Sequence, residues 1–256
     1  MTFKKTLVAA AHAAGRFQLK HFGKLGHVTR HFKAHHEMVT YVDKQSEHKI
    51  IGIIKKQFPG HAIISEESPM QKHIRGEFTW VIDPLDGTTN FAIGNPLFGV
   101  SIGIIDVRGA YEGVLYFPVM RRLLYCRRGH GAYENGRLVH VSRSGLADSI
   151  LSVNFSHNIQ ASRQAMGIMK QLRPCVNNIR IFGSSAFAFS LVANGAVDGL
   201  IMVGTQHHWD VHPGILMATE AGGKVTNFSG KTWDINGRGI IISNGKIHSN
   251  LVRELR

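Results

Sequence analysis

The spacing of hydrophobic residues is helical at the start of the 256-residue chain and becomes strand-like further on. Alanine, leucine and phenylalanine recur among lysines over residues 4–20, which predicts a first amphipathic helix. Residues 43–57 predict a second helix with isoleucines on one face, and Asp43 can cap its N-terminus. The segment between them, residues 26–37, is polar, basic and aperiodic, so we expect a mobile loop there.

Short apolar or alternating segments follow, separated by turn residues, and they predict strands at residues 78–82, 98–105, 111–117 and 122–125. Asn135-Gly136 lies between two further short segments and is a strong signal for a two-residue hairpin. Because no helical pattern interrupts these segments, we expect a largely antiparallel sheet.

In the second half of the chain, strand and helix patterns alternate, and such alternation implies helices packed on a sheet. Strands are expected at residues 150–153, 178–181, 199–203, 224–226 and 239–243, and helices at about 160–172, 185–194 and 210–221 and at the C-terminus. The sequence therefore predicts an α+β N-terminal half, residues 1–145, and an α/β C-terminal half, residues 146–256.

The chain is strongly basic, with 30 Lys and Arg against 17 Asp and Glu, a formal charge of +13 and 16 His. Such a charge attracts phosphorylated substrates or a polyanion such as nucleic acid. No zinc finger or aromatic-basic RNA motif accompanies it, and the basic residues are dispersed apart from Arg121-Arg122, Arg127-Arg128 and the His-rich segment 29–36. Substrate steering and polyanion binding both stay open.

Membrane and disulfide-rich classes are disfavoured. No apolar run reaches the ~18–20 residues of a membrane-spanning helix. The apolar part of the N-terminal segment is short and interrupted by His12, which favours a helix over an export signal. Cys126 and Cys175 are the only cysteines and fit no metal or disulfide spacing. We expect a cytoplasmic protein with free thiols and no membrane association.

Candidate chemistry begins where the apolar strand at residues 80–82 ends. Asp83 and Asp86 flank Pro84-Leu85, and Pro84 ends the strand ladder because it lacks a backbone donor. Two carboxylates three residues apart at a strand end can hold Mg²⁺, which prefers oxygen ligands. The alternative for either aspartate alone is an ordinary turn.

The residues after Asp86 are suited to a phosphate group. Gly87 permits close backbone approach, and Thr88 and Thr89 can start a helix or turn whose N–H groups form a phosphate cradle.

Other acidic residues are ambiguous one by one. Glu66-Glu67 follows an apolar segment and could be a solvated loop, while Asp43 and Asp210 could be helix caps. Taken together with Asp83 and Asp86, they indicate a metal-dependent active site.

The set resembles the inositol monophosphatase family, within the larger group of lithium-sensitive, magnesium-dependent phosphatases that includes fructose-1,6-bisphosphatase. Four segments match in order, namely Val39–Asp43, Ile64–Ser68, Trp80–Phe91 and Trp209-Asp210 with Ala218–Gly223. Weaker matches are Gly129–Ala132 with Asn135-Gly136, and Ile181–Ser185. The resemblance covers nearly the whole chain.

The resemblance implies a layered α-β-α-β-α sandwich, an α/β (α+β) fold, and a homodimer. It implies two or three Mg²⁺ ions per site, held by Glu66, Asp83, the Leu85 carbonyl, Asp86 and Asp210. It also implies catalytic roles for Thr88 and Asp43, which would orient and deprotonate the attacking water, and for Glu66. The matching substrate and phosphate contacts are Asp86, Gly87, Thr88, Ser185 and Asp210.

The segment that would choose the substrate departs from the family pattern. Relatives that act on inositol phosphates commonly carry a glutamate shortly before the Trp-Asp pair, whereas residues 200–208 contain no carboxylate and are one residue longer. Gln206, His207 and His208 either replace the usual hydroxyl contacts or lie at the rim, and both interpretations stay open. Ser185 stands where a small residue, often alanine, contacts substrate.

Three hypotheses result. The first is magnesium-dependent hydrolysis of a small phosphomonoester, inositol monophosphate or a related polyol or sugar phosphate, by in-line attack of metal-activated water. The second is a phosphatase for 3′-phosphoadenosine 5′-phosphate, fructose-1,6-bisphosphate or NADP; Thr89-Asn90 stands against it, because nucleotide-type relatives usually carry a charged pair there. The third is an RNA- or transcription-associated accessory protein that uses its basic surface.

Overall fold

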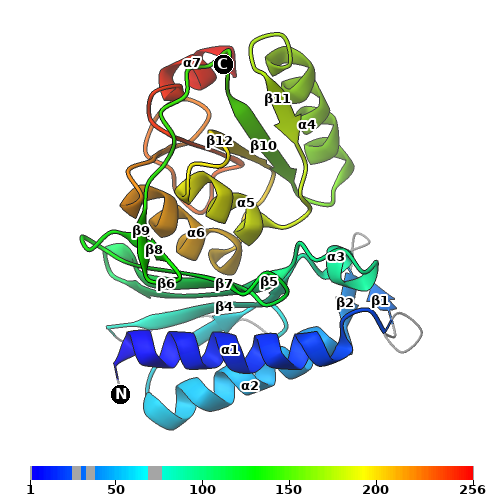
Figure 1. Ribbon diagram of the computed structural model, residues 1–256, viewed down its shortest axis with the longest axis vertical. Helices are drawn as coiled ribbons and strands as arrows, with labels where there is room; N and C mark the ends of the chain where they lie inside the picture. The colour runs from blue at the N-terminus through cyan, green and yellow to red at the C-terminus, as the bar shows by residue number, and fades with distance from the viewer. Residues whose placement is uncertain (1, 25–29, 33–37, 69–76, 256) are drawn as a thin grey trace.

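Five layers make up the protein, in the order helices, sheet, helices, sheet, helices (Figure 1). The computed structural model describes residues 2–24, 30–32, 38–68 and 77–255. The outer layers contain α1 (Phe3–His21) with α2 (Tyr41–Gln57), and α4 (Ile159–Leu172) with α7 (His248–Glu254); the central layer contains α5 (Ser185–Ala193) and α6 (His208–Glu220). The predicted layered α/β sandwich is confirmed.

The first sheet has seven strands in the order β3-β4-β5-β6-β7-β8-β9. Their bounds are β3 (Ala62–Ser65), β4 (Thr79–Asp86), β5 (Gly99–Asp106), β6 (Gly109–Phe117), β7 (Arg122–Arg127), β8 (Ala132–Glu134) and β9 (Arg137–Val139). Every neighbouring pair is antiparallel except β3 and β4, which are parallel. The expected hairpin is present, and Asn135 and Gly136 have φ of 48° and 82°, as the central residues of such a turn require.

The second sheet has five strands in the order β11-β10-β12-β14-β13. Three of them run parallel, namely β10 (Ile150–Phe155), β11 (Asn178–Arg180) and β12 (Gly199–Val203). β14 (Gly239–Ser243) is antiparallel to both β12 and β13 (Lys224–Thr226). The carboxyl ends of the three parallel strands therefore lie at the same end of the sheet.

The hydrophobic core follows the alternation of side chains along the strands. On β12, Leu200 and Met202 pack in the cluster shared with α5 and α6, while Ile201 and Val203 pack in the cluster shared with α4 and α7. Both faces of this strand are buried, as is usual for parallel strands between helices. A third cluster joins α1 and α2 to the first sheet through residues such as Leu7, Ile50, Trp80, Ile102 and Val114.

Helix starts differ by a few residues from the prediction. Thr40, not Asp43, caps α2; Asp43 is the third helical residue and completes a capping box with Thr40. Likewise α6 begins at His208, with Asp210 as its third residue. Each acidic residue therefore lies within the first turn of its helix, where it also meets the positive end of the helix dipole.

Most of the expected loop at residues 26–37 lies outside the described residues. The part that is described, β1 (Arg30–Phe32), pairs with β2 (Met38–Thr40) as an antiparallel ribbon. For these three residues the loop prediction was wrong, because a short strand pair leaves no apolar periodicity in the sequence.

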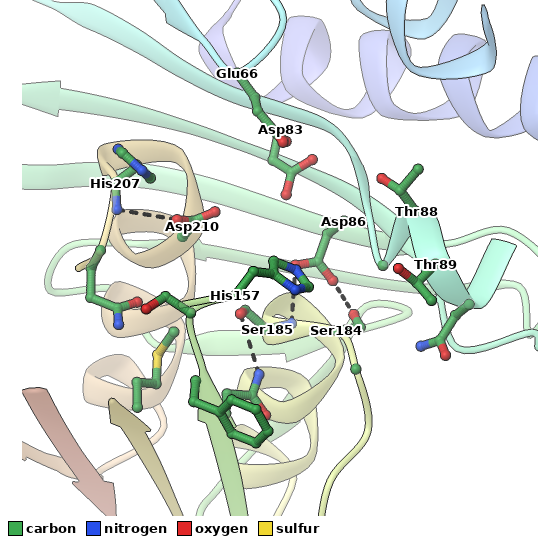
Figure 2. A pocket seen from close by; sticks show the side chains of 18 of the residues that line it. Glu66, Asp83, Asp86, Thr88, Thr89, His157, Ser184, Ser185, His207 and Asp210 are labelled. Carbon is green, nitrogen blue, oxygen red and sulfur yellow. Dashed lines mark hydrogen bonds between the residues drawn. The ribbon is translucent and has the colours of Figure 1, made fainter. Parts of the chain in front are cut away.

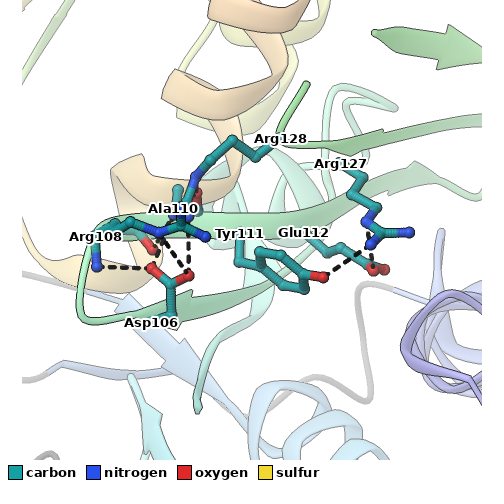
Figure 3. A network of polar contacts seen from close by, with 8 residues as sticks. Asp106, Arg108, Ala110, Tyr111, Glu112, Arg127 and Arg128 are labelled. Atoms are coloured by element: carbon teal, nitrogen blue, oxygen red, sulfur yellow. Dashed lines mark hydrogen bonds and ion pairs between the residues drawn. The ribbon is translucent and has the colours of Figure 1, made fainter. Parts of the chain in front are cut away.

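Two consecutive arginines at the end of β7, Arg127 and Arg128, contact acidic side chains of β6 and β5 (Figure 3). Arg128 forms two hydrogen bonds with Asp106, at 2.9 and 3.0 Å, which lower the pKa of Asp106 below its usual value. Arg127 lies 3.7 Å from Glu112 and donates to the Tyr111 hydroxyl at 3.0 Å. These arginines therefore cross-link the sheet.

Among the described residues, the longest apolar stretches within helices are too short or too polar to span a lipid bilayer.

Candidate active site

A cavity of about 620 Å³ opens where the strands of both sheets end. It is bounded by the ends of β3 and β4 from the first sheet, the ends of β10, β11 and β12 from the second, and the starts of α5 and α6. Ligand sites of α/β proteins commonly form at such carboxyl ends. Eight of the nine residues expected from the sequence line it, namely Glu66, Asp83, Leu85, Asp86, Gly87, Thr88, Ser185 and Asp210.

The end of β4 is shaped by an interruption of the strand ladder. β4 pairs with β5 through Asp83 and Ser101 and again through Asp86 and Gly99, with a register shift between the two pairs. Inside this interruption the Leu85 N–H donates to Asp83 Oδ1 at 3.0 Å. Both aspartates are thereby turned toward one cavity although the strand is buried along its length.

Negative charge is concentrated in this cavity. The pKa of Asp83 is raised well above its usual value, first by burial and then by the like charges of Glu66, Asp86 and Asp210. Figure 2 shows Glu66, Asp83 and Asp86 facing the same space from one side, with Asp210 on the other. A bound cation would relieve this repulsion.

Asp86 also joins the two halves of the chain. One of its oxygens accepts from the Ser184 hydroxyl, and the other accepts from the N–H groups of Ser185 at 3.0 Å and Ala186 at 3.2 Å. These donors form the first turn of α5, so Asp86 lies at the positive end of that helix. Burial raises the pKa of Asp86, and these three hydrogen bonds oppose the rise.

Asp43, the ninth expected residue, does not line the cavity but touches Thr88, which does. Thr88 Oγ1 donates to Asp43 Oδ1 at 2.8 Å and lies 3.0 Å from the Leu85 carbonyl oxygen. Asp43 Oδ2 accepts from the Thr40 N–H at 2.8 Å and from the Thr40 hydroxyl. Burial raises the pKa of Asp43 to about 6, despite the hydrogen bonds from Thr40 and Thr88.

Gly87 and Asn90 hold the turn between β4 and α3 (Thr88–Ala92). Gly87 has φ of +83°, and a Cβ there would lie 2.8 Å from the Leu97 carbonyl oxygen, so a larger residue would not fit. Asn90 Nδ2 donates to the carbonyl oxygens of Leu97, at 2.7 Å, and Phe182, at 2.8 Å. Asn90 therefore links the motif to the loop that leads into α5.

Residues 206–208, at the start of α6, differ in whether they border the cavity. Gln206 and His207 line the cavity, and the His207 N–H donates to Asp210 Oδ2 at 3.1 Å (Figure 2). His208 is not among the lining residues; its Nδ1 lies 2.9 Å from Nε2 of His212. Gln206 and His207 are therefore placed to contact a substrate or form the rim, as expected, and His208 is not.

Sequence reasoning missed the wall formed by the loop after β10. Asn154, near the end of β10, and Ser156, His157 and Asn158, which follow the strand, line the cavity on the side of the second sheet. Asn154 Nδ2 also contacts the Ser185 hydroxyl at 3.2 Å. The sequence did contain a signal for this wall. The polar run directly follows a predicted strand, and the strands parallel to it end on the same side of the sheet.

Comparison with known proteins agrees with this arrangement. A profile described as the Inositol monophosphatase family matches residues 2–256. A fructose-1,6-bisphosphatase/inositol-1-monophosphatase of Thermotoga maritima is 32% identical over 241 residues, covering 93% of this chain and 90% of the relative. A Nus factor SuhB of Pasteurella multocida is 38% identical over 226 residues, covering 87% and 84%.

Solved structures lead to the same group. The extragenic suppressor protein suhB of Bartonella henselae superposes with a TM-score of 0.93 at 32% identity, covering 99% of this chain and 98% of that one. The inositol monophosphatase of Thermotoga maritima gives 0.87 at 30% identity, covering 97% and 94%. The chain therefore belongs to the inositol monophosphatase family and is a phosphatase of the hydrolase class.

Proposed function

We propose that the protein hydrolyses a small phosphomonoester of a polyol or sugar, with inositol monophosphate as the representative substrate, and that Mg²⁺ is required. The observation that carries the proposal is the convergence of Glu66, Asp83, Asp86 and Asp210 on one cavity beside the Thr88–Asp43 hydrogen bond. In this proposal residues 1–145 supply most of the cation ligands, and residues 146–256 supply Asp210, Ser185 and the opposite wall.

The donor set fits hard divalent cations. All four acidic side chains offer carboxylate oxygens, which Mg²⁺ prefers, and their mutual repulsion favours a cation between them. Within the described ranges, no three His, Cys, Asp or Glu side chains already converge on one cation position. Mg²⁺ usually takes only one or two carboxylates, so the Leu85 carbonyl, phosphate oxygens and water would complete each set.

When bound, Mg²⁺ would neutralise the carboxylates, polarise the phosphate and lower the pKa of a coordinated water. The chain's own residues would then handle the proton. Thr88 Oγ1 already donates to Asp43, and an aspartate whose pKa is about 6 can accept a proton near neutral pH. Gly87 and Thr88 would present backbone N–H groups to the phosphate.

The opposite wall supports a polyol or sugar as the alcohol part of the substrate. Asn154, Ser156, Asn158, Thr205 and Gln206 offer amide and hydroxyl groups to the cavity. Such neutral donors and acceptors match the hydroxyl groups of a polyol.

Phosphate release from inositol, sugar and nucleotide monophosphates and bisphosphates, with Mg²⁺ and with a chelator, tests the proposal. We expect release that needs Mg²⁺, is abolished by Asp83→Asn, and is unchanged by the control Asp148→Asn, because Asp148 is exposed and lies outside the cavity. Full turnover by Asp83→Asn would refute the metal assignment. A bisphosphate or nucleotide as the preferred substrate would refute the polyol assignment.

One observation favours a second function, association with nucleic acid. Every exposed ionisable side chain of α1 and α2 other than Tyr41 is basic, namely Lys4, Lys5, Arg16, Lys20, Lys44, His48, Lys49, Lys55 and Lys56. Helices α1 and α2 lie on the opposite side of the first sheet from α5 and α6 (Figure 1), whose first residues border the cavity. The relatives that carry the name Nus factor fit this possibility.

A gel-shift titration with RNA at two salt concentrations tests it. Charge reversal of Arg16, Lys20 and Lys49 to glutamate should abolish a salt-sensitive shift, whereas Asp83→Asn should preserve it. A shift that survives charge reversal would exclude the α1–α2 face.

At the level of the family we also propose lithium inhibition, a homodimer and a cytoplasmic location. Lithium titration of phosphate release and light scattering of the purified protein test the first two.

A further inference from the structure

Gln18 connects the outermost helix to the motif at the end of β4. Its side chain is fully buried on α1, and Nε2 donates to the Pro84 carbonyl oxygen at 2.7 Å. Because a carbonyl only accepts hydrogen bonds, the amide nitrogen must face it, which fixes the orientation of the amide. The other amide atom, Oε1, is then buried without a hydrogen-bond donor among the described residues.

This arrangement is unfavourable for stability alone. A buried acceptor without a donor loses its hydration and gains nothing in return. The rest of the buried face of α1 consists mostly of small or apolar residues such as Leu7, Ala10, Ala11 and Ala14. An amide at position 18 therefore calls for an explanation in the contact that it makes.

That contact lies where the strand ladder is interrupted. The register of β4 against β5 shifts between Asp83 and Asp86, and Pro84 lies inside this interval. Gln18 supplies a donor to the Pro84 carbonyl from a different layer of the fold.

The peptide group held by Gln18 is the same one that orients Asp83. The Pro84 carbonyl and the Leu85 N–H belong to one planar unit, and the Leu85 N–H donates to Asp83 Oδ1 at 3.0 Å. A hydrogen bond accepted at one end of a peptide group polarises the group and strengthens donation at the other end. Gln18 therefore acts on the Asp83 carboxylate through two successive hydrogen bonds.

We propose that Gln18 is a positioning residue, which holds the Pro84–Leu85 peptide so that the Asp83 carboxylate and the Leu85 carbonyl are preformed as cation ligands. This inference rests on the proposed function, because it takes these two groups as Mg²⁺ ligands. Gln18 itself does not line the cavity, so it would act on the cation ligands through the Pro84–Leu85 peptide.

The test compares Gln18→Met with Thr6→Val by calorimetric titration of Mg²⁺ in the absence of substrate. Methionine fills a similar volume without a donor. Thr6 is equally buried on α1, but within the described part of the chain its hydroxyl forms a hydrogen bond only to the Thr2 carbonyl, at 3.3 Å. Since loss of a group that supports metal ligands typically weakens affinity by 10-fold or more, we expect about a tenfold weaker Mg²⁺ affinity for Gln18→Met and wild-type affinity for Thr6→Val.

Phosphate release gives a second readout. Gln18→Met should raise the Mg²⁺ concentration needed for half-maximal rate, while the substrate KM at saturating Mg²⁺ stays unchanged. Gln18→Leu provides a second variant if the methionine variant does not fold.

Wild-type Mg²⁺ affinity in a folded Gln18 variant would overturn the inference, as would equal weakening by Thr6→Val. A different result would refute the proposed function. If the wild-type protein binds Mg²⁺ but releases no phosphate, the activity is refuted, and the calorimetric comparison of the variants remains valid.

Discussion

Asn90→Asp probes the link between the two halves of the active site with almost no change in volume. In the wild type, Asn90 Nδ2 donates to the Leu97 and Phe182 carbonyl oxygens at 2.7 and 2.8 Å, and its Oδ1 accepts from Asn95 Nδ2 at 3.1 Å. Aspartate retains the acceptor but replaces the donor with an oxygen that faces two carbonyl oxygens. Both carbonyls would lose their partner, and a charge would be placed beside them.

The expected loss of stability follows from these contacts. Each buried acceptor left without a partner costs about 1–3 kcal/mol, and Asn90 itself is 7% exposed, so we expect the free energy of unfolding to fall by about 3–5 kcal/mol. For a chain of this length, each kcal/mol corresponds to a shift of roughly 2–4 °C in Tm, so Tm should fall by about 10 °C.

Urea unfolding and calorimetry would measure the change, with Asn236→Asp as the control. Asn236 is an exposed asparagine outside the cavity, so the same chemical change there should leave the midpoint unchanged. Equal midpoints for the two variants would refute the view that Asn90 joins the halves. Below its Tm, Asn90→Asp should also lower kcat, because the loop after Phe182 leads into the helix turn that binds Asp86.

Three further predictions concern other parts of the fold. The Glu220 carboxylate accepts hydrogen bonds from three backbone N–H groups of the turn at residues 129–131, at 2.8, 3.0 and 2.7 Å. Glu220→Gln can keep at most two of these bonds, so urea titration should show a free energy of unfolding lower by about 1–2 kcal/mol. Burial lowers the pKa of His248 from 6.5 to about 4, so its stabilising contribution is complete above pH 6.5 and is lost as the pH falls toward 4. The loss can reach about 3 kcal/mol, and His248→Gln should flatten the dependence of the urea midpoint on pH in this range. Gly204 has φ of +96°, and a Cβ there would lie 2.1 Å from Ser156 Oγ, so Gly204→Ala should displace the loop after β10 and raise KM more than it lowers kcat; an unchanged KM would show that this loop does not contact the substrate.

Much of the fold could be predicted because its elements obey local rules. The hairpin at Asn135-Gly136 and the helices over 160–172 and 185–194 carry their own turn and periodicity signals, and all are present. The parallel pairing of β3 with β4 could not be read locally, because a parallel pair has no tight turn that would mark it in the sequence. The starts of α2 and α6 were predicted two residues too late, because Asp43 and Asp210 look like caps until the residues before each helix are seen to fill that position.

The candidate site divides in the same way. The carboxylates were predictable because they cluster in motifs at strand ends, and acids are scarce elsewhere in this basic chain. The wall from Asn154 to Asn158 was not, because a polar loop gives no indication of which cavity it borders until the order of strands is known. Gln18 was hidden for a further reason, since its partner is a backbone carbonyl 66 residues away and leaves no trace in side-chain types.

The contacts of Asp86 with the start of α5 have a consequence during protein synthesis. The motif that contains Asp86 leaves the ribosome long before Ser184 and Asp210 are made, and chains emerge N-terminal part first. A growing chain therefore carries Glu66, Asp83 and Asp86 without the helix turn that donates to Asp86 or the fourth carboxylate. Under the proposed function, phosphatase activity would begin only when synthesis is nearly complete, and prematurely terminated chains would lack it.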